Sequence, residues 1–215
     1  MYAKISGGYE GRTQCDVIYD VSPVRDGIRR PESPLEMELC HRCAPVLLGV
    51  KPAALFQASI QVVRLLVRMS KLCPIELCPL DVSPQNQIFV YIPELLERAL
   101  ARPGALYLLR SIGYGGDRGS AYVRELIRRI QGSRSGRNLF PHEIGIFLGY
   151  PLEDVLGFWM NGGYSPLSEG PWKCYSDTER ATQLQKIHKD AENVMREALL
   201  AGVTLEEILR EYWRP

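Results

Sequence analysis

The segment around Cys43 concentrates residue types that can carry out covalent chemistry. Cys43 follows His41 and Arg42, and Lys51 comes a few residues later. The thiolate is the nucleophilic form of cysteine, and nearby cations or a helix N-terminus lower the thiol pKa. Pro45 favours the first turn of a helix, so we expect a helix to begin beside Cys43. The pattern predicts a reactive thiol, and a small apolar cysteine packed at a helix start fits it equally well.

A second segment, residues 140–158, places one of the three histidines among apolar residues. His142 stands at an expected helix start next to Glu143, and Asp154 lies further along the segment. An imidazole beside a carboxylate can act as a general base, with the carboxylate orienting the ring. We therefore interpret Cys43 as nucleophile, His142 as base, and Glu143 or Asp154 as the orienting group. The structural alternative is a helix-capping histidine beside a solvated glutamate.

A third segment, residues 172–175, reads as a strand with an amphipathic pattern. Alternation along a strand places Trp172 on one face and Lys173 and Tyr175 on the other. A lysine and a tyrosine on one face can bind an anion or assist proton transfer, and such a pair is also typical of the solvated face of a sheet. The residues that we expect to contact a substrate are Lys51, Tyr150, Trp172, Lys173 and Tyr175.

The cysteine spacing leaves a metal site open as an alternative. Cys40 and Cys43 form a Cys-x-x-Cys pair, and Cys73 and Cys78 form a second pair with four intervening residues. Four thiolates can hold zinc or iron in a tetrahedral site. The second pair flanks a strand-like run, however, where the two side chains need not converge. A related interpretation is a metal or cofactor site formed by Cys40, Cys43 and His142, in a protein of iron or redox metabolism.

Composition indicates an ordinary globular protein rather than a membrane or nucleic-acid protein. Among 215 residues, 46% are hydrophobic and 24% are charged, which supplies a sizeable core, and the net charge is +1. A chain this close to neutrality is not expected to bind nucleic acid. The first residues contain no apolar run, and the longest apolar stretch is interrupted by glutamines and arginines. We expect a cytoplasmic protein that does not enter the membrane and keeps its six cysteines reduced.

The elements that must position these residues are mostly helices. Residues 1–36 are rich in Gly, Pro, Arg and Asp, and we expect a loosely packed extension with one short β-prone run. Residues 37–215 are predicted to form a single α+β domain, mainly helical with a small antiparallel sheet. A mostly buried helix is expected to begin at Pro52 and end before Pro74.

Proline and capping residues mark the other expected elements. Residues 75–80 and 87–92 are predicted to form an antiparallel hairpin, because turn-forming residues join them. Pro141 and Pro151 each open a short helix, and Gly149 is expected to take a left-handed conformation between them. Two capping boxes then predict a long helix after Ser176 and a last helix after Thr204.

Three of these segments resemble an uncharacterised prokaryotic family, domain-of-unknown-function family 3793. The segments that carry the resemblance are residues 43–56, 140–158 and 172–175. It extends from Leu39 to the C-terminus and implies cytoplasmic proteins of anaerobic bacteria and archaea, with no established activity and no confirmed catalytic residue. Related sequences tend to carry Cys-Gly shortly before Trp-Lys, where this chain has Glu169, Gly170 and Pro171, and a hydroxyl residue where Val46 stands.

Three function classes follow from these residues. The first is a thiol enzyme that performs acyl or amide transfer or hydrolysis on a small-molecule, peptide or acyl substrate. It requires Cys43 and His142 to line one pocket. The second is a metal- or cofactor-binding protein, and the third is a partner-binding module in which the motifs are structural. The first is favoured because a reactive thiol needs a cation, a base and a shaped backbone, which the two segments can supply.

Overall fold

The computed structural model describes most of the chain from Ser33 onward and two short strands before it. The described residues are 2–5, 17–20, 33–80, 87–117, 119–134, 136 and 139–214. Strand β1 (Tyr2–Ile5) pairs antiparallel with β2 (Val17–Asp20), which falls within the predicted β-prone run. The prediction that residues 1–36 form a loosely packed extension lies largely outside the described residues.

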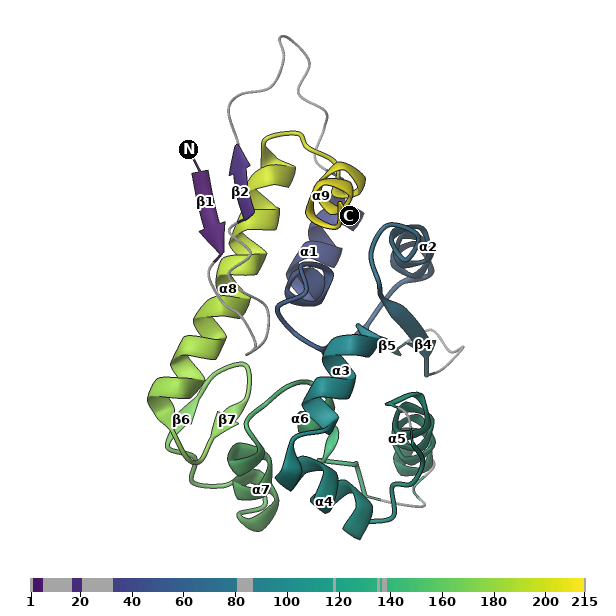
Figure 1. The fold of residues 1–215 in the computed structure, drawn as a ribbon, viewed down its shortest axis with the longest axis vertical. Coiled ribbons are helices and arrows are strands. Elements are labelled where there is room, and N and C mark those ends of the chain that lie inside the picture. The colour runs from purple at the N-terminus through teal and green to yellow at the C-terminus, as the bar shows by residue number, and fades with distance from the viewer. Residues whose placement is uncertain are drawn as a thin grey trace.

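Helices dominate the described part of the chain, as predicted (Figure 1). The helices are α1 (Pro34–Leu47), α2 (Ile60–Met69), α3 (Pro93–Leu100), α4 (Pro103–Ser111), α5 (Gly119–Arg134), α6 (Ile144–Phe147), α7 (Leu152–Met160), α8 (Thr178–Leu200) and α9 (Leu205–Tyr212). The strands that follow α1 are β3 (Ala53–Gln57), β4 (Glu76–Pro79), β5 (Gln87–Tyr91), β6 (Ser168–Glu169) and β7 (Lys173–Cys174). The α+β fold class predicted from the sequence is therefore confirmed.

A three-stranded antiparallel sheet in the order β3-β5-β4 divides the core into two clusters. Ile88 and Val90 of β5 pack with α1, α2, α8 and α9 in the first cluster. Phe89 and Tyr91 alternate to the other face and pack with α3, α4, α5 and α6 in the second. Figure 1 shows these two helical groups on either side of the sheet. Strand alternation thus places neighbouring residues in different cores.

The expectation of a helix beginning at Pro52 is wrong for its first residues. Residues 53–57 form the edge strand β3, and α2 begins at Ile60 after the side chain of Ser59 caps its N-terminus. The spacing of the apolar residues in this run predicts a helix. In the structure, however, Ala54 and Phe56 pack on one face of a strand that pairs with β5. Long-range pairing with β5 decides the conformation here, and local pattern does not contain that information.

Helix α9 closes the first core over the end of α1. Trp213 Nε1 donates to the Leu47 carbonyl at 2.8 Å, and the Tyr212 hydroxyl donates to the Leu48 carbonyl. Gly49 follows with φ of +62°, where a Cβ would lie 3.1 Å from the Trp213 ring. The backbone N–H of Lys51 then donates to the Pro45 carbonyl at 3.0 Å, so this turn fixes where Lys51 lies.

Asp154 joins α7 to the segment between β7 and α8. Its Oδ1 accepts from the Tyr175 N–H at 2.8 Å and from the Ser176 N–H and hydroxyl at 3.1 and 2.8 Å, and its Oδ2 accepts from Trp172 Nε1 at 2.9 Å. The side chain is 2% exposed. Gly149, with φ of +84°, ends α6 in the predicted left-handed conformation and sets the direction of α7. Together these contacts hold residues 140–158 against the β6–β7 hairpin.

Candidate functional site

The second and third predicted segments meet at one pocket, which we call the His142 pocket. Its volume is about 320 Å³, and it lies where α6 and α7 meet the residues that connect β6 to β7 and Lys173 of β7. Its lining residues are His142, Ile144, Gly145, Tyr150, Asp154, Val155, Phe158, Gly170, Pro171, Trp172 and Lys173. The structure therefore brings five of the predicted site residues together, His142, Tyr150, Asp154, Trp172 and Lys173.

Aromatic rings form much of the wall of the His142 pocket. Tyr150 and Trp172 stack with ring centroids 4.7 Å apart at an interplanar angle of 21°. The His142 ring lies 4.9 Å from Phe158 and 5.8 Å from Phe140. Flat apolar walls of this kind bind planar or aliphatic groups through burial and ring stacking.

The polar groups at the mouth of the pocket are basic. The His142 side chain is exposed and makes no hydrogen bond or ion pair with a described residue. Lys173 Nζ donates to the Gly163 carbonyl at 2.7 Å and lies 3.4 Å from Oε1 of the exposed Glu169. An exposed pair like this one contributes little stability and exchanges readily with another carboxylate. The mouth can therefore accept an anionic group.

Asp154 lines the pocket, but its carboxylate is fully engaged by structural hydrogen bonds. Burial alone would raise its pKa, and the hydrogen bonds from Tyr175, Trp172 and Ser176 outweigh burial and lower the pKa instead. Its partners are these donors, and His142 is not one of them. The predicted role of Asp154 as the group that orients His142 has no geometric basis here, because the carboxylate points to the β7–α8 segment.

Glu143 faces away from His142 and joins a different network. Its Oε1 accepts from the Tyr114 hydroxyl and from Arg129 Nη1, each at 3.1 Å, and its side chain is buried. The Arg129 guanidinium lies 4.3 Å from the centroid of the Tyr114 ring. Glu143 therefore ties the start of α6 to α5, and the predicted alternative of a solvated glutamate is wrong. Adjacent residues at a helix start project in different directions, so neighbours in sequence need not share a site.

Cys43 lies in the first core and is not among the residues that line the His142 pocket. It is fully buried in the second half of α1, which begins at Pro34 with Ser33 as its cap. Burial raises the pKa of the Cys43 thiol, Lys51 opposes this effect, and Cys73 adds to it. Two predictions are therefore wrong: Pro45 lies inside the helix rather than at its start, and the thiol pKa is raised rather than lowered.

Lys51 connects the buried core to the aromatic wall. Its Nζ lies 5.4 Å from the centroid of the Tyr150 ring. Burial lowers the pKa of Lys51 to about 8, and the nearby Cys43 opposes this shift. The Lys51 ammonium group makes no hydrogen bond or ion pair with a described residue. A lysine with a lowered pKa and no carboxylate partner is a feature of functional sites as well as of tightly packed interiors.

His188 of α8 is a titratable group that the sequence analysis missed. Its Nε2 is buried and has no hydrogen-bond partner in the part of the chain that the structure describes, and its ring lies 6.3 Å from that of Trp172. Burial and the charge of Lys51 lower the pKa of His188 to about 4. The sequence contains a signal that predicts burial of His188, because position 188 falls at helical spacing from Leu184 and Ala191 on the buried face of α8.

The remaining predicted residues are dispersed. Tyr175 packs against Gly157 of α7, where a Cβ would lie 2.3 Å from that of the tyrosine, and its hydroxyl is buried without a hydrogen-bond partner among the described residues. Among the described residues, no group of three or more His, Cys, Asp and Glu side chains is placed to hold a metal ion. The alternative site of Cys40, Cys43, Cys73 and Cys78 fails because Cys78 packs against the second core and the other three lie in the first.

Comparisons with known proteins identify a family but no activity. A family model described as "Protein of unknown function (DUF3793)" matches residues 39–209. No curated protein and no solved structure matches the chain. Within the part of the chain that the structure describes, no helix combines the length and apolar character needed to cross a membrane.

Proposed function

We propose that this chain, which belongs to the family described as "Protein of unknown function (DUF3793)", is a binding protein for apolar ligands that carry a carboxylate. The ligand class is an acyl or aromatic carboxylate, either free or at the C-terminus of a peptide. The apolar group enters the His142 pocket, and the carboxylate contacts His142 and Lys173 at its mouth.

One observation carries this proposal: aromatic walls and two basic side chains converge from separate segments on one pocket. The pocket has a volume of about 320 Å³. Its one lining carboxylate, Asp154, already accepts four hydrogen bonds, so it does not compete for His142 or Lys173. An apolar cavity with a few basic groups at its edge is typical of sites for amphipathic anions.

Exposed apolar side chains in the segments that precede His142 and follow Phe158 along the chain support a ligand that extends beyond the pocket. They belong to residues 139–140 and 159–167 and are Leu139, Phe140, Trp159, Met160, Tyr164 and Leu167. Phe140 contacts His142, and the backbone of Gly163 lies against the Phe158 ring and accepts a hydrogen bond from Lys173. Met160 is 84% exposed. Large apolar side chains gathered beside a pocket are a feature of binding surfaces.

The burial of Cys43 weighs against the thiol-enzyme reading. A nucleophilic cysteine needs access to its substrate and an accessible thiolate, and this thiol has neither a solvent-exposed surface nor a lowered pKa. The five described cysteines are all free thiols. This state agrees with our inference that the protein works in the reducing cytoplasm.

A displacement assay with two matched ligands tests the proposal. N-acetylphenylalanine offers an aromatic ring and a carboxylate, and N-acetylphenylalanine amide keeps the ring without the charge. We expect the carboxylate to displace the fluorescent aromatic anion 8-anilinonaphthalene-1-sulfonate at about tenfold lower concentration than the amide. His142→Ala and Lys173→Met should remove this preference, whereas Lys189→Met, an exposed lysine on α8, should leave it intact. Equal displacement by both ligands contradicts the proposal.

A further inference from the structure

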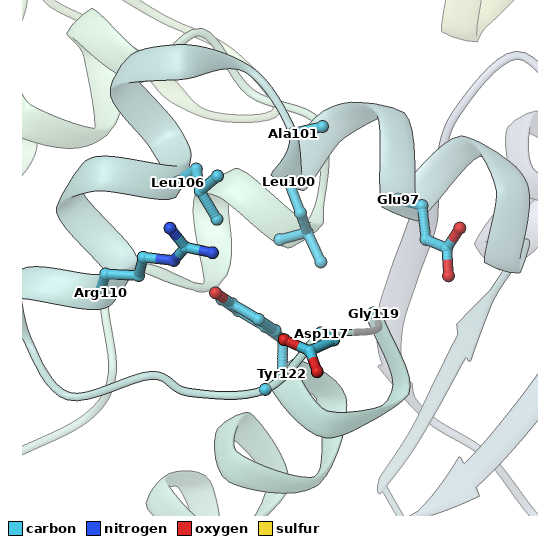
Figure 2. Close-up of a pocket in the computed structure, with 9 residues that line it drawn as sticks. Glu97, Leu100, Ala101, Leu106, Arg110, Asp117, Gly119 and Tyr122 are labelled. Carbon is cyan, nitrogen blue, oxygen red and sulfur yellow. The ribbon is translucent and has the colours of Figure 1, made fainter.

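A second cavity lies on the other side of the α3–α4 corner, and it shares no lining residue with the His142 pocket. Its volume is about 330 Å³ (Figure 2). It is enclosed by α3, α4, the loop after α4 and the start of α5. Its lining residues are Glu97, Leu100, Ala101, Leu106, Arg110, Gly116, Asp117, Gly119 and Tyr122.

Tyr122 supplies the observation that points to a ligand. Its side chain is 4% exposed, and its hydroxyl is buried without a hydrogen-bond partner among the described residues. The ring is held by stacking on Tyr114 with centroids 5.8 Å apart. Figure 2 shows the hydroxyl directed into the cavity toward Arg110. A buried hydroxyl without a partner is costly, and a ligand atom in the cavity would satisfy it.

The three charged residues that line this cavity, Glu97, Arg110 and Asp117, are exposed and are separated in space (Figure 2). Arg110 of α4 enters from the side opposite Glu97 of α3, with Asp117 between them near Tyr122 (Figure 2). None of these three side chains makes an ion pair with a described residue. The apolar side chains of Leu100 and Leu106 lie between the two charged ends. Among the described residues, the lining of the cavity therefore offers one cation, two carboxylates and an apolar middle.

This charge pattern excludes simple ions and favours one class of small molecule. A plain anion at Arg110 would face two carboxylates without compensation, and a plain cation would face Arg110. A molecule with one carboxylate and two amino groups matches every charge. We propose that this cavity binds a cationic amino acid such as lysine: its carboxylate contacts Arg110 and the Tyr122 hydroxyl, its α-ammonium contacts Asp117, and its distal ammonium contacts Glu97. This inference is independent of the function proposed for the His142 pocket.

Isothermal titration with three closely related probes tests the charge assignment. L-lysine carries all three charges, L-norleucine lacks the distal ammonium, and cadaverine lacks the carboxylate. We expect L-lysine to bind at least about tenfold more tightly than either analogue, because each one leaves a charged group of the cavity without its partner. Absence of L-lysine binding, or equal affinity for L-lysine and L-norleucine, overturns the proposal.

Variants separate a ligand contact from a structural role. Tyr122→Phe removes the unpartnered hydroxyl, so it should weaken L-lysine binding about tenfold without lowering the melting temperature of the free protein. Tyr107→Phe is the matched control, since Tyr107 is an exposed tyrosine of α4, and it should change neither quantity. Glu97→Gln should abolish the preference for L-lysine over L-norleucine. A Tyr122→Phe protein that binds L-lysine normally, or that melts at a lower temperature, overturns the assignment of the hydroxyl to ligand binding.

Discussion

The regions around Cys43 and His142 both contain residue types that can act in catalysis, but the two regions differ in how deeply the fold buries them. Cys43 sits on the inner face of α1 under α8 and α9, with burial raising the pKa of its thiol. His142 sits in the turn just before α6, and its exposed side chain lines an aromatic pocket. Lys51 and His188 lie between these regions, behind Tyr150 and Trp172. Burial therefore decides which reactive groups can meet a ligand, and residue type alone does not.

Thiol labelling offers the largest contrast between the two regions. In the folded protein, Cys43 should react with limiting iodoacetamide at least about a hundredfold more slowly than the half-buried Cys78, because Cys43 has no exposed surface, and burial raises the pKa of both thiols. Mass spectrometry of the labelled peptides measures both rates. The control is the urea-unfolded protein, in which the two rates should converge. Fast labelling of Cys43 in the folded protein would restore the thiol-enzyme reading.

Loss of the Asp154 carboxylate should be the most destabilising single change at the pocket. Asp154→Ala leaves the donors of Trp172, Tyr175 and Ser176 without their acceptor, at a cost of about 3 kcal/mol in the free energy of unfolding. Glu153→Ala, an exposed position on the same helix turn, should cost about 0.5 kcal/mol. Urea titration compares the two variants. Equal stabilities would mean that Asp154 does not hold α7 to the β7–α8 segment.

His188 should make the free energy of unfolding depend on pH. Burial and Lys51 lower the pKa of His188 to about 4 from an ordinary value of 6.5, so the unfolded chain binds more protons between these values. The contribution of His188 to the free energy of unfolding is therefore complete above pH 6.5 and is lost as the pH falls toward 4. Between pH 7 and pH 4.5, the free energy of unfolding should fall by about 2 kcal/mol less in His188→Leu than in the unchanged protein. Urea titrations at the two pH values measure this difference. His142→Ala serves as the control, and a matching effect there would contradict the assignment.

The smallest predicted effect concerns the turn that aims α7 at the hairpin. Gly149 has φ of +84°, which strains any residue with a Cβ, so Gly149→Ala should lower the free energy of unfolding by about 1 kcal/mol. Gly115→Ala is a suitable control, since a Cβ there would meet no neighbouring atom within 4 Å. Thermal melts of both variants measure the difference. An unchanged Gly149→Ala protein would mean that this turn tolerates other conformations.

Local signals in the sequence predict the elements that capping and turn residues define. The Thr204 capping box, the β4–β5 hairpin and the left-handed Gly149 are present as predicted. These features depend on contacts within a few residues, which a local pattern contains. The convergence of residues 142–158 and 170–173 on one pocket was not derivable, because it depends on hydrogen bonds that Asp154 accepts from residues about twenty positions away.

The errors share a physical cause. Whether α1 exposes Cys43 depends on how α8 packs against α1. On the face of α1 that carries Cys43, Cys40 Sγ donates to the Glu192 carbonyl of α8 at 3.5 Å. Whether residues 53–57 form a strand depends on pairing with β5. Both are long-range events that a periodic pattern does not encode. Pro45 was misleading because a helix can continue past a proline where tertiary contacts hold it.

The most direct test of the account is proton NMR of the three histidine rings during a titration with N-acetylphenylalanine. His142 lines the pocket, His41 pairs with Glu192 on the outside of α1 and α8, and His188 is buried behind Trp172. If the pocket binds apolar carboxylates, the His142 ring signals should shift with saturation while those of His41 remain unchanged, and the amide analogue should shift them about tenfold less effectively. Unshifted His142 signals at saturating ligand would contradict the proposed function.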